Sequence, residues 1–565
     1  MAALPLLTRI ADNDTGLAYL TPVEANLPVG LTRRDAVPGP LGLLRPVVDA
    51  PETRMPTRAL EPGEQYRFHF DMRKCIACKC CVVACNEQNG NPASINWRRV
   101  TEIEAGYFPN ATRAFLSMGC NHCLEPTCLQ GCPVDAYSKD PVTGIVRHSA
   151  DACIGCQYCT WNCSYGVPQY NPERGVVGKC DMCHGRLSQG QTPACVAACP
   201  EGAIEIEIVN TADWRAAVAA VGTVPPASVS PVATVATIPL YRRAQDVPGF
   251  NPSTLPTGDY SLSTTRVTPR ELPPNAQPVG ISHVRPDHPH WPLVVMTVLT
   301  QLSVGAFATI WLLNMFGATT GLGIAALASL AVGGLALSAS TLHLGRPAFA
   351  YRALRMWRRS WLSREVLLFS LFSGIAGAYD GLLWLGLPGG ALVGALTVLV
   401  GIAGVSASAC IYRVPSRPAW NTPFTLVQFN LTAGVLGPLF AAAVGAGQTR
   451  WLAVAAAAMA GGQFLLLALR FLRCIASDSV ELRGTARLLS TVLRRTLLLR
   501  GALLAVGAVA LPLVVGGSGV APLVVMPLAL LLALAAEILG RYLFFVSVVP
   551  RHMAAPYMAA GSEAA

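Results

Sequence analysis

The sequence predicts two parts of different class: a cysteine-rich α+β domain and, after it, an all-α bundle of eight membrane-spanning helices. Three observations support this division. Seventeen of the 19 cysteines lie between residues 75 and 199. Apolar runs long enough to cross a bilayer follow residue 290. The whole chain of 565 residues is 52% hydrophobic and only 13% charged, with a mean hydropathy of +0.44, which excludes an ordinary soluble protein.

Sixteen of these cysteines form four groups of four. The first and third groups have the C-x2-C-x2-C-x3-C spacing of bacterial ferredoxins, in which a tight loop aims three thiolates at one [4Fe–4S] cluster and the fourth thiolate reaches a neighbouring cluster. Sixteen ligands therefore predict four [4Fe–4S] clusters. The groups are Cys75, Cys78, Cys81 and Cys85; Cys120, Cys123, Cys128 and Cys132; Cys153, Cys156, Cys159 and Cys163; and Cys180, Cys183, Cys195 and Cys199.

Two other uses of cysteine fit this pattern less well. Disulfide frameworks are typical of small secreted domains, and nothing here resembles a secretory signal. Structural zinc uses paired C-x2-C knuckles, which the fourth group could supply, but zinc does not explain the triple-cysteine loops of the first and third groups. Cys80, which precedes Cys81, lies outside the repeated spacing and is expected to be an ordinary thiol.

The two halves of a ferredoxin exchange their fourth cysteines, which predicts the ligands of each cluster. Groups two and three should form one ferredoxin-like unit, with groups one and four forming a second unit around it. The expected sets are Cys75, Cys78, Cys81 and Cys199 for cluster a; Cys180, Cys183, Cys195 and Cys85 for cluster b; Cys120, Cys123, Cys128 and Cys163 for cluster c; and Cys153, Cys156, Cys159 and Cys132 for cluster d. The fold class is thus an α+β double ferredoxin-like iron–sulfur domain followed by the helical bundle, with short strands predicted over 66–71 and 145–148.

Composition sets the remaining boundaries. The first 62 residues are rich in Pro, Leu and Arg and are expected to lie over a partner subunit; their Arg33-Arg34 pair has no hydrophobic segment after it and is not a twin-arginine export signal. A Pro-rich stretch predicts an extended linker between the domains. The predicted segments are an N-terminal extension at 1–62, the iron–sulfur domain at 63–210, the linker at 211–290, the membrane domain at 291–550 and a tail at 551–565.

Eight apolar runs have the length of a membrane span, which is about 20 residues. They lie at about 292–316, 321–343, 364–387, 389–412, 424–446, 451–473, 496–516 and 520–548. Eight spans put the iron–sulfur domain and the C-terminus on one side. The loops of that side carry Arg346, Arg352, Arg355, Arg358, Arg359, Arg364, Arg413, Arg417, Arg473, Arg483, Arg487, Arg494, Arg495 and Arg551, whereas the opposite loops carry only Arg450.

This asymmetry predicts the orientation of the protein. By the positive-inside rule the arginine-rich face, and the iron–sulfur domain with it, is cytoplasmic at a bacterial inner membrane. The position of these arginines at the helix ends also accounts for the net charge of +10 without a nucleic-acid partner, since no aromatic-and-basic module accompanies the charge.

A membrane domain beside such clusters is expected to exchange electrons with haem or quinone. Haem b in a helical bundle usually takes two axial histidines within the spans, and of the nine histidines only His343 lies even at a helix end, so no haem is expected. Quinone is then the expected redox partner. Quinol oxidation releases protons, so its site needs a base or hydrogen-bonding groups near the clusters. The candidates, where the second and third helices meet the arginine-rich face, are His343, Arg346, Arg364 and Glu365.

Each candidate also has a structural interpretation. Arg346 and Arg364 would serve equally as topological anchors, and Glu365 as a first-turn acid favoured by the helix dipole. Asp380 and Glu537 also fall within apolar runs, where ionisable groups are costly and usually functional. We expect Glu537 to pair with Arg541 one helical turn away, in a structural role.

Several stretches resemble the subunits of dimethyl sulfoxide reductase-type molybdoenzymes. The first half is similar to the four-cluster subunit in Cys120-Asn121-His122-Cys123, in Cys153-Ile154-Gly155-Cys156, and in residues 165–171 with Lys179-Cys180-Asp181. The second half is similar to the anchor subunit in His290-Trp291-Pro292-Leu293, Leu342-His343-Leu344-Gly345, Leu362-Ser363-Arg364-Glu365 and residues 537–541. The stretch 85–90 is also similar to cluster subunits of cytoplasmic sulfite-oxidising complexes. The resemblance covers about 66–210 and 288–550.

The resemblance implies a natural fusion of two usually separate subunits, with eight helices, no haem, and a quinol site at the cytoplasmic end near Glu365. It also implies a separate catalytic subunit that holds a molybdenum bis-pterin cofactor. The expected function is that of an electron-transfer and membrane-anchor subunit, passing electrons between the membrane quinone pool and that partner through the four clusters. The direction stays open: outward flow would reduce an acceptor such as a sulfoxide, and inward flow would oxidise a donor such as sulfite.

Two functions of other classes remain as alternatives. An ion-translocating protein would use Glu365, Asp380 and Glu537 as a proton relay, although these carboxylates are scattered rather than strung across the bilayer. A membrane-tethered redox sensor would use its helices only as an anchor.

Overall fold

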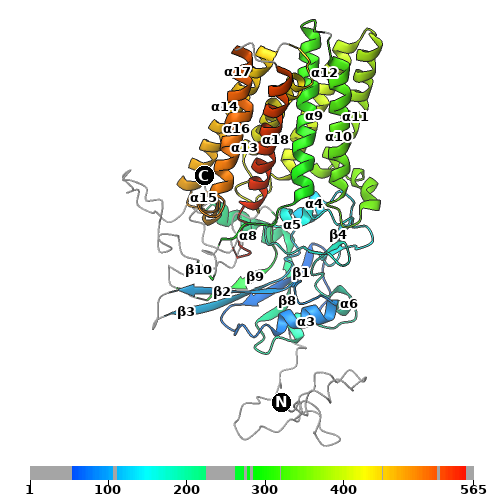
Figure 1. Ribbon diagram of the computed structural model, residues 1–565. Coiled ribbons are helices and arrows are strands. Elements are labelled where there is room, and N and C mark those ends of the chain that lie inside the picture. Colours follow the sequence, from blue (N-terminus) through cyan, green and yellow to red (C-terminus); the bar gives the residue numbers. More distant parts are fainter. Residues whose placement is uncertain are drawn as a thin grey trace, which may run out of the picture.

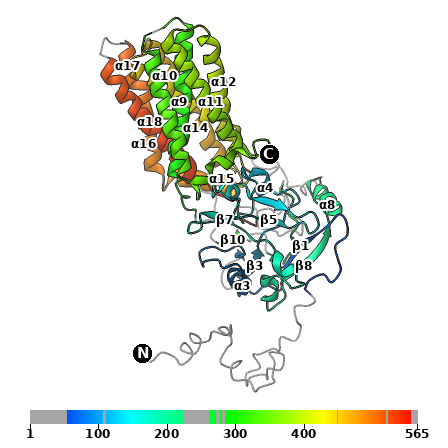
Figure 2. The same ribbon diagram turned by 90° about the vertical axis from the view of Figure 1, so that its right-hand side faces the viewer.

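The computed structural model describes residues 54–105, 111–223, 261–270, 272, 277–279, 284–318, 320–447, 449–517 and 522–554. These residues form a small α+β domain at one end of a long helical bundle, and both views show the two parts end to end (Figures 1 and 2). Of the predicted N-terminal extension, only residues 54–62 fall within the described part, and the C-terminal tail is described up to Ala554.

The central sheet of the α+β domain joins distant parts of the chain. Its strands are β1 (Glu64–Asp71), β8 (Ile204–Asn210) and β9 (Arg266–Thr268), in the order β8-β1-β9. The first two are antiparallel, from Glu64 opposite Asn210 to Phe70 opposite Ile204, and β9 runs parallel to β1. Side chains alternate across a strand, and Phe68, Phe70, Ile204 and Ile206 face a common core. The strand predicted over 66–71 is confirmed.

A second sheet and two hairpins complete the β structure. The sheet has the order β10-β2-β3, with β2 (Arg99–Ala105), β3 (Thr112–Met118) and β10 (Gln277–Pro278). The hairpins are β4 (Tyr137–Lys139) with β5 (Val146–His148), and β6 (Gln169–Asn171) with β7 (Val176–Gly178). The turn between β4 and β5 is closed by Asp140, whose Oδ1 accepts from the amides of Val142 and Thr143 at 2.9 Å, and by Gly144 at φ +70°.

Five short helices follow the cysteine loops. They are α3 (Cys80–Asn89), α4 (Thr127–Gly131), α5 (Tyr158–Asn162), α6 (His184–Leu187) and α7 (Ala194–Ala197). Three of them begin directly after a non-glycine residue in the left-handed region, namely Lys79, Gln157 or Cys183. That conformation is rare for such residues and curls the preceding loop back on itself. Helix α3 packs on α7, and α4 packs on α5.

The segment predicted as an extended linker differs from that expectation at its start. Residues 211–223 form the helix α8 (Thr211–Thr223), in which Trp214 is buried. Further along, residues 266–268 and 277–278 add strands to the two sheets of the α+β domain. Residues 266–268 and 277–278 therefore belong structurally to that domain, whereas Asp287 N donates to Val546 O of the bundle at 2.9 Å.

All eight predicted membrane spans are present as helices, with ends that differ by a few residues. The helices are α9 (Trp291–Met315), α10 (Leu322–Thr341), α11 (Trp361–Leu385), α12 (Gly390–Ile411), α13 (Pro423–Ala443), α14 (Thr449–Ala476), α16 (Arg494–Leu504) continued through the π-helical η5 (Ala505–Ala510) into α17 (Leu511–Gly517), and α18 (Pro522–Val546). A 3-10 segment, η4 (Pro347–Leu354), precedes α11, and the amphipathic α15 (Val480–Ser490) follows α14.

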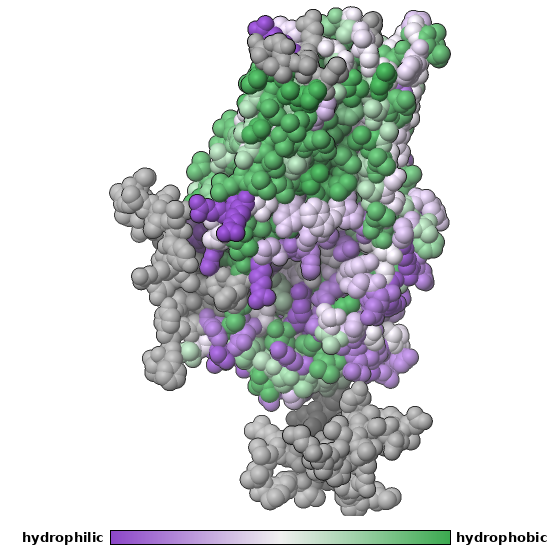
Figure 3. Space-filling view, in the orientation of Figure 1, coloured by the Kyte–Doolittle hydropathy of each residue, from purple (hydrophilic) through white to green (hydrophobic). Residues whose placement is uncertain are grey.

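Helix α9 lies in the middle of the bundle, where it packs against α10, α12, α13 and α18. A Cβ at Gly305 would overlap the backbone of Ala433, and one at Gly437 would overlap Gly305, so small residues allow α9 and α13 to touch. The outer surface of the bundle forms an apolar band that ends at the polar α+β domain (Figure 3). The start of α9 and the end of α18 both lie at that junction (Figure 1).

Candidate cluster sites and quinone site

Two small cavities of the α+β domain are each lined by four cysteines, which come from two of the four groups. One is lined by Cys75, Cys78, Cys81 and Cys199, and the other by Cys120, Cys123, Cys128 and Cys163. Each cavity therefore combines three cysteines of one group with the last cysteine of another. These combinations are the sets expected for clusters a and c.

The other eight cysteines also lie near members of another group. Cys85 interacts electrostatically with Cys195 and Cys183, and Cys159 with Cys156, Cys153 and Cys132. Backbone amides point at four of the cysteine sulfurs: Ala136 N at Cys132 Sγ at 3.3 Å, Gly155 N at Cys153 Sγ at 3.4 Å, Met182 N at Cys180 Sγ at 3.4 Å, and Ala203 N at Cys199 Sγ at 3.2 Å. Sulfur-directed amides are among the interactions that set the potential of an iron–sulfur cluster.

The pKa values of the buried thiols indicate that the cysteine loops need a bound cation. Burial raises the pKa of Cys75 to about 11 and that of Cys85 to about 12. The pKa of Cys183 rises to about 11 for the same reason. Cysteine binds a metal as the thiolate, and a bound cation supplies the charge that stabilises this form. The four-thiol loops, their inward amides and the burial of most of their cysteines fit [4Fe–4S] clusters, which would be held by these cysteines and would supply one-electron chemistry.

Two buried cations lie among the cysteines. The first, Arg98, is 2% exposed and close to Cys81, Cys85, Cys180 and Cys195. Burial alone would lower the pKa of Arg98, but the surrounding thiols hold it above its usual value. The sequence gives no signal of this burial, because an arginine just before a strand is more often exposed to solvent.

The second buried cation, Lys179, is 3% exposed. Its Nζ donates to Cys180 O at 2.8 Å and lies 3.7 Å from Cys120 Sγ. Burial lowers the pKa of Lys179, and the nearby thiols outweigh this effect and raise it. A lysine directly before a metal-binding cysteine was a usable sequence signal, because a charge inside a cysteine-rich core needs an opposite charge.

The loops of groups two and three lie directly on the end of the bundle. Gly345 N donates to Gly155 O at 3.4 Å, and Ser360 Oγ donates to Gly131 O at 2.7 Å. The cysteines expected to hold cluster d therefore touch the membrane domain, whereas α3, with Cys81, lies at the far end of the α+β domain (Figure 1). One apolar cluster contains Cys132, Cys153 and Cys159 together with Leu344, Phe349, Leu362 and Val366 of the membrane domain.

Of the four residues predicted for the quinone site, Glu365 is the most enclosed. It lies on α11, is 7% exposed, and has Ser408, Tyr158 and Tyr412 as neighbours. The Ser408 hydroxyl lies beside the Glu365 carboxylate. Tyr158 lies on α5, and Tyr412 lies at the end of α12. The spacing of residues in the sequence could not identify these three neighbours, because α5 and the end of α12 are both far from Glu365 in the chain.

The other three predicted residues do not join Glu365. Arg346 Nη1 donates to Ala150 O at 2.8 Å, and Arg364 donates to the carbonyls of Trp357 and Arg358. His343 is half-buried, and burial lowers its pKa to about 4, so it is neutral at pH 7. Among the described residues, no hydrogen bond or ion pair connects these four side chains to one another.

The expected pairing of Glu537 with Arg541 is wrong. Glu537 accepts from Thr432 Oγ1 at 2.8 Å, and Arg541 Nη2 donates to Gln301 Oε1 at 2.8 Å. The Arg541 guanidinium also stacks 3.5 Å from the Phe429 ring centroid. Residues one turn apart on a helix can meet, but here neighbouring helices offer polar partners to each group separately.

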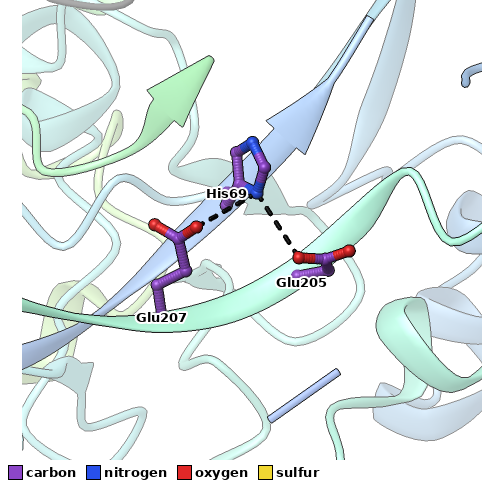
Figure 4. A group of neighbouring side chains, drawn as sticks. All are labelled: His69, Glu205 and Glu207. Carbon is purple, nitrogen blue, oxygen red and sulfur yellow. Dashed lines mark ion pairs between the residues drawn. The ribbon is translucent and has the colours of Figure 1, made fainter. Parts of the chain in front are cut away.

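A histidine and two carboxylates form a separate group outside the cysteine loops. His69 Nδ1 of β1 lies 3.5 Å from Glu205 and 3.2 Å from Glu207 of β8 (Figure 4). Arg67 and Arg266 both form ion pairs with Glu207. Two guanidinium groups already neutralise the Glu207 carboxylate, so this cluster of side chains is a poor metal site. Its ion pairs instead connect β1, β8 and β9.

Comparison with known proteins gives two family matches and several relatives. Residues 111–208 match the 4Fe-4S dicluster domain family, and residues 286–546 match the family described as DMSO reductase anchor subunit (DmsC). The sequence is 36% identical over 156 residues to a component of the anaerobic dimethyl sulfoxide reductase of Haemophilus influenzae, a match that covers 26% of this chain and 76% of the relative.

Two further relatives match a similar share of the chain. The sequence is 38% identical over 149 residues to a component of the anaerobic dimethyl sulfoxide reductase of Escherichia coli, covering 25% of this chain and 72% of the relative. It is 33% identical over 176 residues to a component of the sulfite dehydrogenase of Allochromatium vinosum, covering 27% and 73%. A match to an iron–sulfur domain and a match to an anchor subunit thus follow one another in a single chain.

Proposed function

The protein belongs to the family of dimethyl sulfoxide reductase iron–sulfur and anchor subunits, and from this premise we propose that it carries electrons between a membrane quinone and a molybdenum-containing catalytic subunit. It is an electron-transfer and membrane-anchor subunit in which the two usual components are fused. The expected four clusters, their ligand sets a to d, the quinone and the molybdenum bis-pterin partner are parts of the proposal.

The observation that carries the proposal is that the cysteine sets extend through the α+β domain, from its contact with the helical bundle to its opposite end. The cysteines assigned to cluster d pack against the bundle at Leu362 and Val366, which flank Glu365. The cysteines assigned to cluster a lie at the opposite end, where Cys78 is exposed. A file of clusters between these ends would connect the membrane with a partner bound at the far surface.

The membrane end has groups suited to handling the protons of a quinol. Glu365 is a carboxylate in a span, where ionisable groups are costly and mark functional sites. We assign to it the acceptance of a quinol proton, because a general base must lie within reach of the hydroxyl that loses it. The Ser408 hydroxyl beside it can hydrogen-bond a quinone oxygen. His343, neutral at pH 7, lies at the same end of the bundle.

The far end has features of a docking surface for the catalytic subunit. Ile76 and Val83 are 58% and 59% exposed beside the loop of Cys75 and Cys78. A protein bound at this end would remove both apolar side chains from water. We therefore place the molybdenum-containing partner there, and the iron–sulfur domain in the cytoplasm of a bacterial cell because of the arginine-rich loops at the junction.

The test is electron transfer in membranes that contain this protein without its partner. Quinol addition is expected to reduce the clusters, detected as new EPR signals, and a quinol-site inhibitor is expected to block that reduction. Clusters that dithionite reduces but quinol does not would contradict the proposal and favour a tethered sensor. Adding back the candidate catalytic subunit with a sulfoxide or with sulfite then decides the direction of flow.

A further inference from the structure

The connection between the two domains passes through the α+β domain at residues 261–265. Four of these five residues are polar and almost completely buried: Ser261 at 2%, Ser263 and Thr264 at 0%, and Thr265 at 3% exposure. Buried polar groups need hydrogen-bond partners, because burying them without partners is unfavourable. A run of four such residues indicates a segment built into its surroundings.

The partners of this segment belong to the loop of the second cysteine group. Leu124 N donates to Leu262 O at 2.9 Å, and Glu125 N donates to Ser261 O at 3.0 Å. Thr264 Oγ1 donates to Asn121 O at 2.8 Å, and Thr265 Oγ1 donates to Asn121 Oδ1 at 2.7 Å. The segment therefore holds the loop between Cys120 and Cys128 from one side.

One side chain of the segment reaches a cysteine sulfur. Ser261 Oγ donates to Cys123 Sγ at 3.3 Å and lines the cavity of Cys120, Cys123, Cys128 and Cys163. The contact is direct and partly buried. A hydrogen bond to a ligand sulfur stabilises the more negative, reduced state of a cluster, and so raises its reduction potential.

We propose that Ser261 is a positioning residue that raises the reduction potential of the cluster held by Cys120, Cys123, Cys128 and Cys163. The inference rests on the proposed function, in which these cysteines hold cluster c. It assigns a redox role to the segment that joins the two domains. Ser261 lies 138 residues after Cys123 in the chain. The reduction potential of the cluster therefore depends on how the segment between the two domains is packed.

The protein contains a matched comparison for this role. Ser117 Oγ lies 3.5 Å from Cys81 Sγ, in the cavity of Cys75, Cys78, Cys81 and Cys199. Both serines are 2% exposed, and each lies within hydrogen-bond distance of a cysteine sulfur. They differ in the cysteine set that they touch, so each should affect a different cluster.

The experiment is an EPR-monitored redox titration of the full-length, cluster-loaded protein in detergent. Ser261→Ala is expected to lower the midpoint potential of one cluster and leave the other signals at wild-type potential. Ser261→Thr, which keeps the hydroxyl, should return that potential toward the wild-type value. Ser117→Ala should shift a different signal.

The inference is overturned if Ser261→Ala retains all clusters at unchanged potentials, or if it shifts the same signal as Ser117→Ala. Should Ser261→Ala lose a cluster, Ser261→Cys provides the deciding measurement: a weaker donor of similar size should give an intermediate potential, and a wild-type potential contradicts the inference. Failure of the proposed function is distinguishable, because the clusters of the wild-type protein would then be reduced by dithionite but not by quinol, whatever their potentials.

Discussion

Gly345 of the membrane domain and Gly155 of the third cysteine loop touch backbone to backbone. Gly345 N donates to Gly155 O, and a Cβ at Gly155 would lie 2.8 Å from Gly345 Cα. Gly155 has φ +70°, a conformation that glycine adopts without cost. Two glycines from separate domains thus bring the loop that carries Cys153 and Cys156 against the bundle.

Replacing Gly345 by Ala should separate the domains at this contact. The new side chain would overlap the Gly175 carbonyl, and overpacking of this kind costs roughly 1–3 kcal/mol. We expect a lower melting temperature and slower reduction of the clusters by quinol, with dithionite reduction intact. Gly334→Ala is the matched control, because nothing lies within 4 Å of a Cβ there. Equal effects of both variants would show that the glycine contact has no special role.

Replacing Glu365 by Gln should slow quinol oxidation by a factor on the order of 10² or more, the usual contribution of a general base. The amide keeps the size of the side chain but cannot take up the proton. Stopped-flow cluster reduction by quinol measures the effect, and dithionite-reduced EPR spectra verify that the clusters are intact. Asp380→Asn on the same helix, about 22 Å away at 1.5 Å per residue, should leave the rate within a few-fold of wild type. A proton relay through both carboxylates would instead make the two variants similar.

Cys85→Ser tests the exchange of cysteines between groups. If Cys85 serves cluster b, its loss should remove the same EPR signal as Cys183→Ser, although the two residues belong to different groups. Iron content should fall by about one cluster in each variant, since four ligands hold each one. Loss of the signal that Cys78→Ser removes would instead show that the first group binds its own cluster.

The local parts of this structure could be predicted from the sequence, and the parts assembled from distant segments could not. Apolar runs predicted all eight spans because about 20 residues suffice to cross a bilayer, whatever their neighbours. The spacing of Cys75 to Cys85 similarly limits that loop to one kind of site. By contrast, the Ser261–Cys123 contact and the burial of Arg98 depend on packing between elements far apart in the chain.

The same distinction explains the mistaken and the incomplete predictions. Glu537 and Arg541 have the right spacing to pair, but Thr432 and Gln301 on other helices satisfy them. Helix α8 forms at the start of a Pro-rich stretch because residues 211–223 contain no proline and because Trp214 is buried in the α+β domain, which stabilises the helix. Neighbouring elements decided both cases.

The final prediction concerns His552, where the polypeptide returns to the α+β domain after the last span. Its Nδ1 accepts from Ala554 N at 3.2 Å, which requires the unprotonated ring nitrogen. Burial, and after it the charge of Arg99, lowers the pKa of His552 to about 4. In the unfolded state a histidine has a pKa of about 6.5, so between about pH 6.5 and 4 the unfolded state binds the additional proton. Stability should therefore fall as the pH falls through this window and be independent of His552 above it.

The His552→Gln variant isolates this contribution, because its amide oxygen can still accept from Ala554 N but cannot titrate. At about pH 5 the wild-type protein should have lost about 2 kcal/mol that the variant retains, which is the part of the effect of this pKa difference that is expressed by that pH. Thermal unfolding of both proteins at about pH 7.5 and about pH 5, followed by intrinsic fluorescence, measures the difference in slope. Parallel losses in the two proteins would place the acid sensitivity in other groups, among which His148, with a pKa also lowered to about 4 by burial, would be the next to replace.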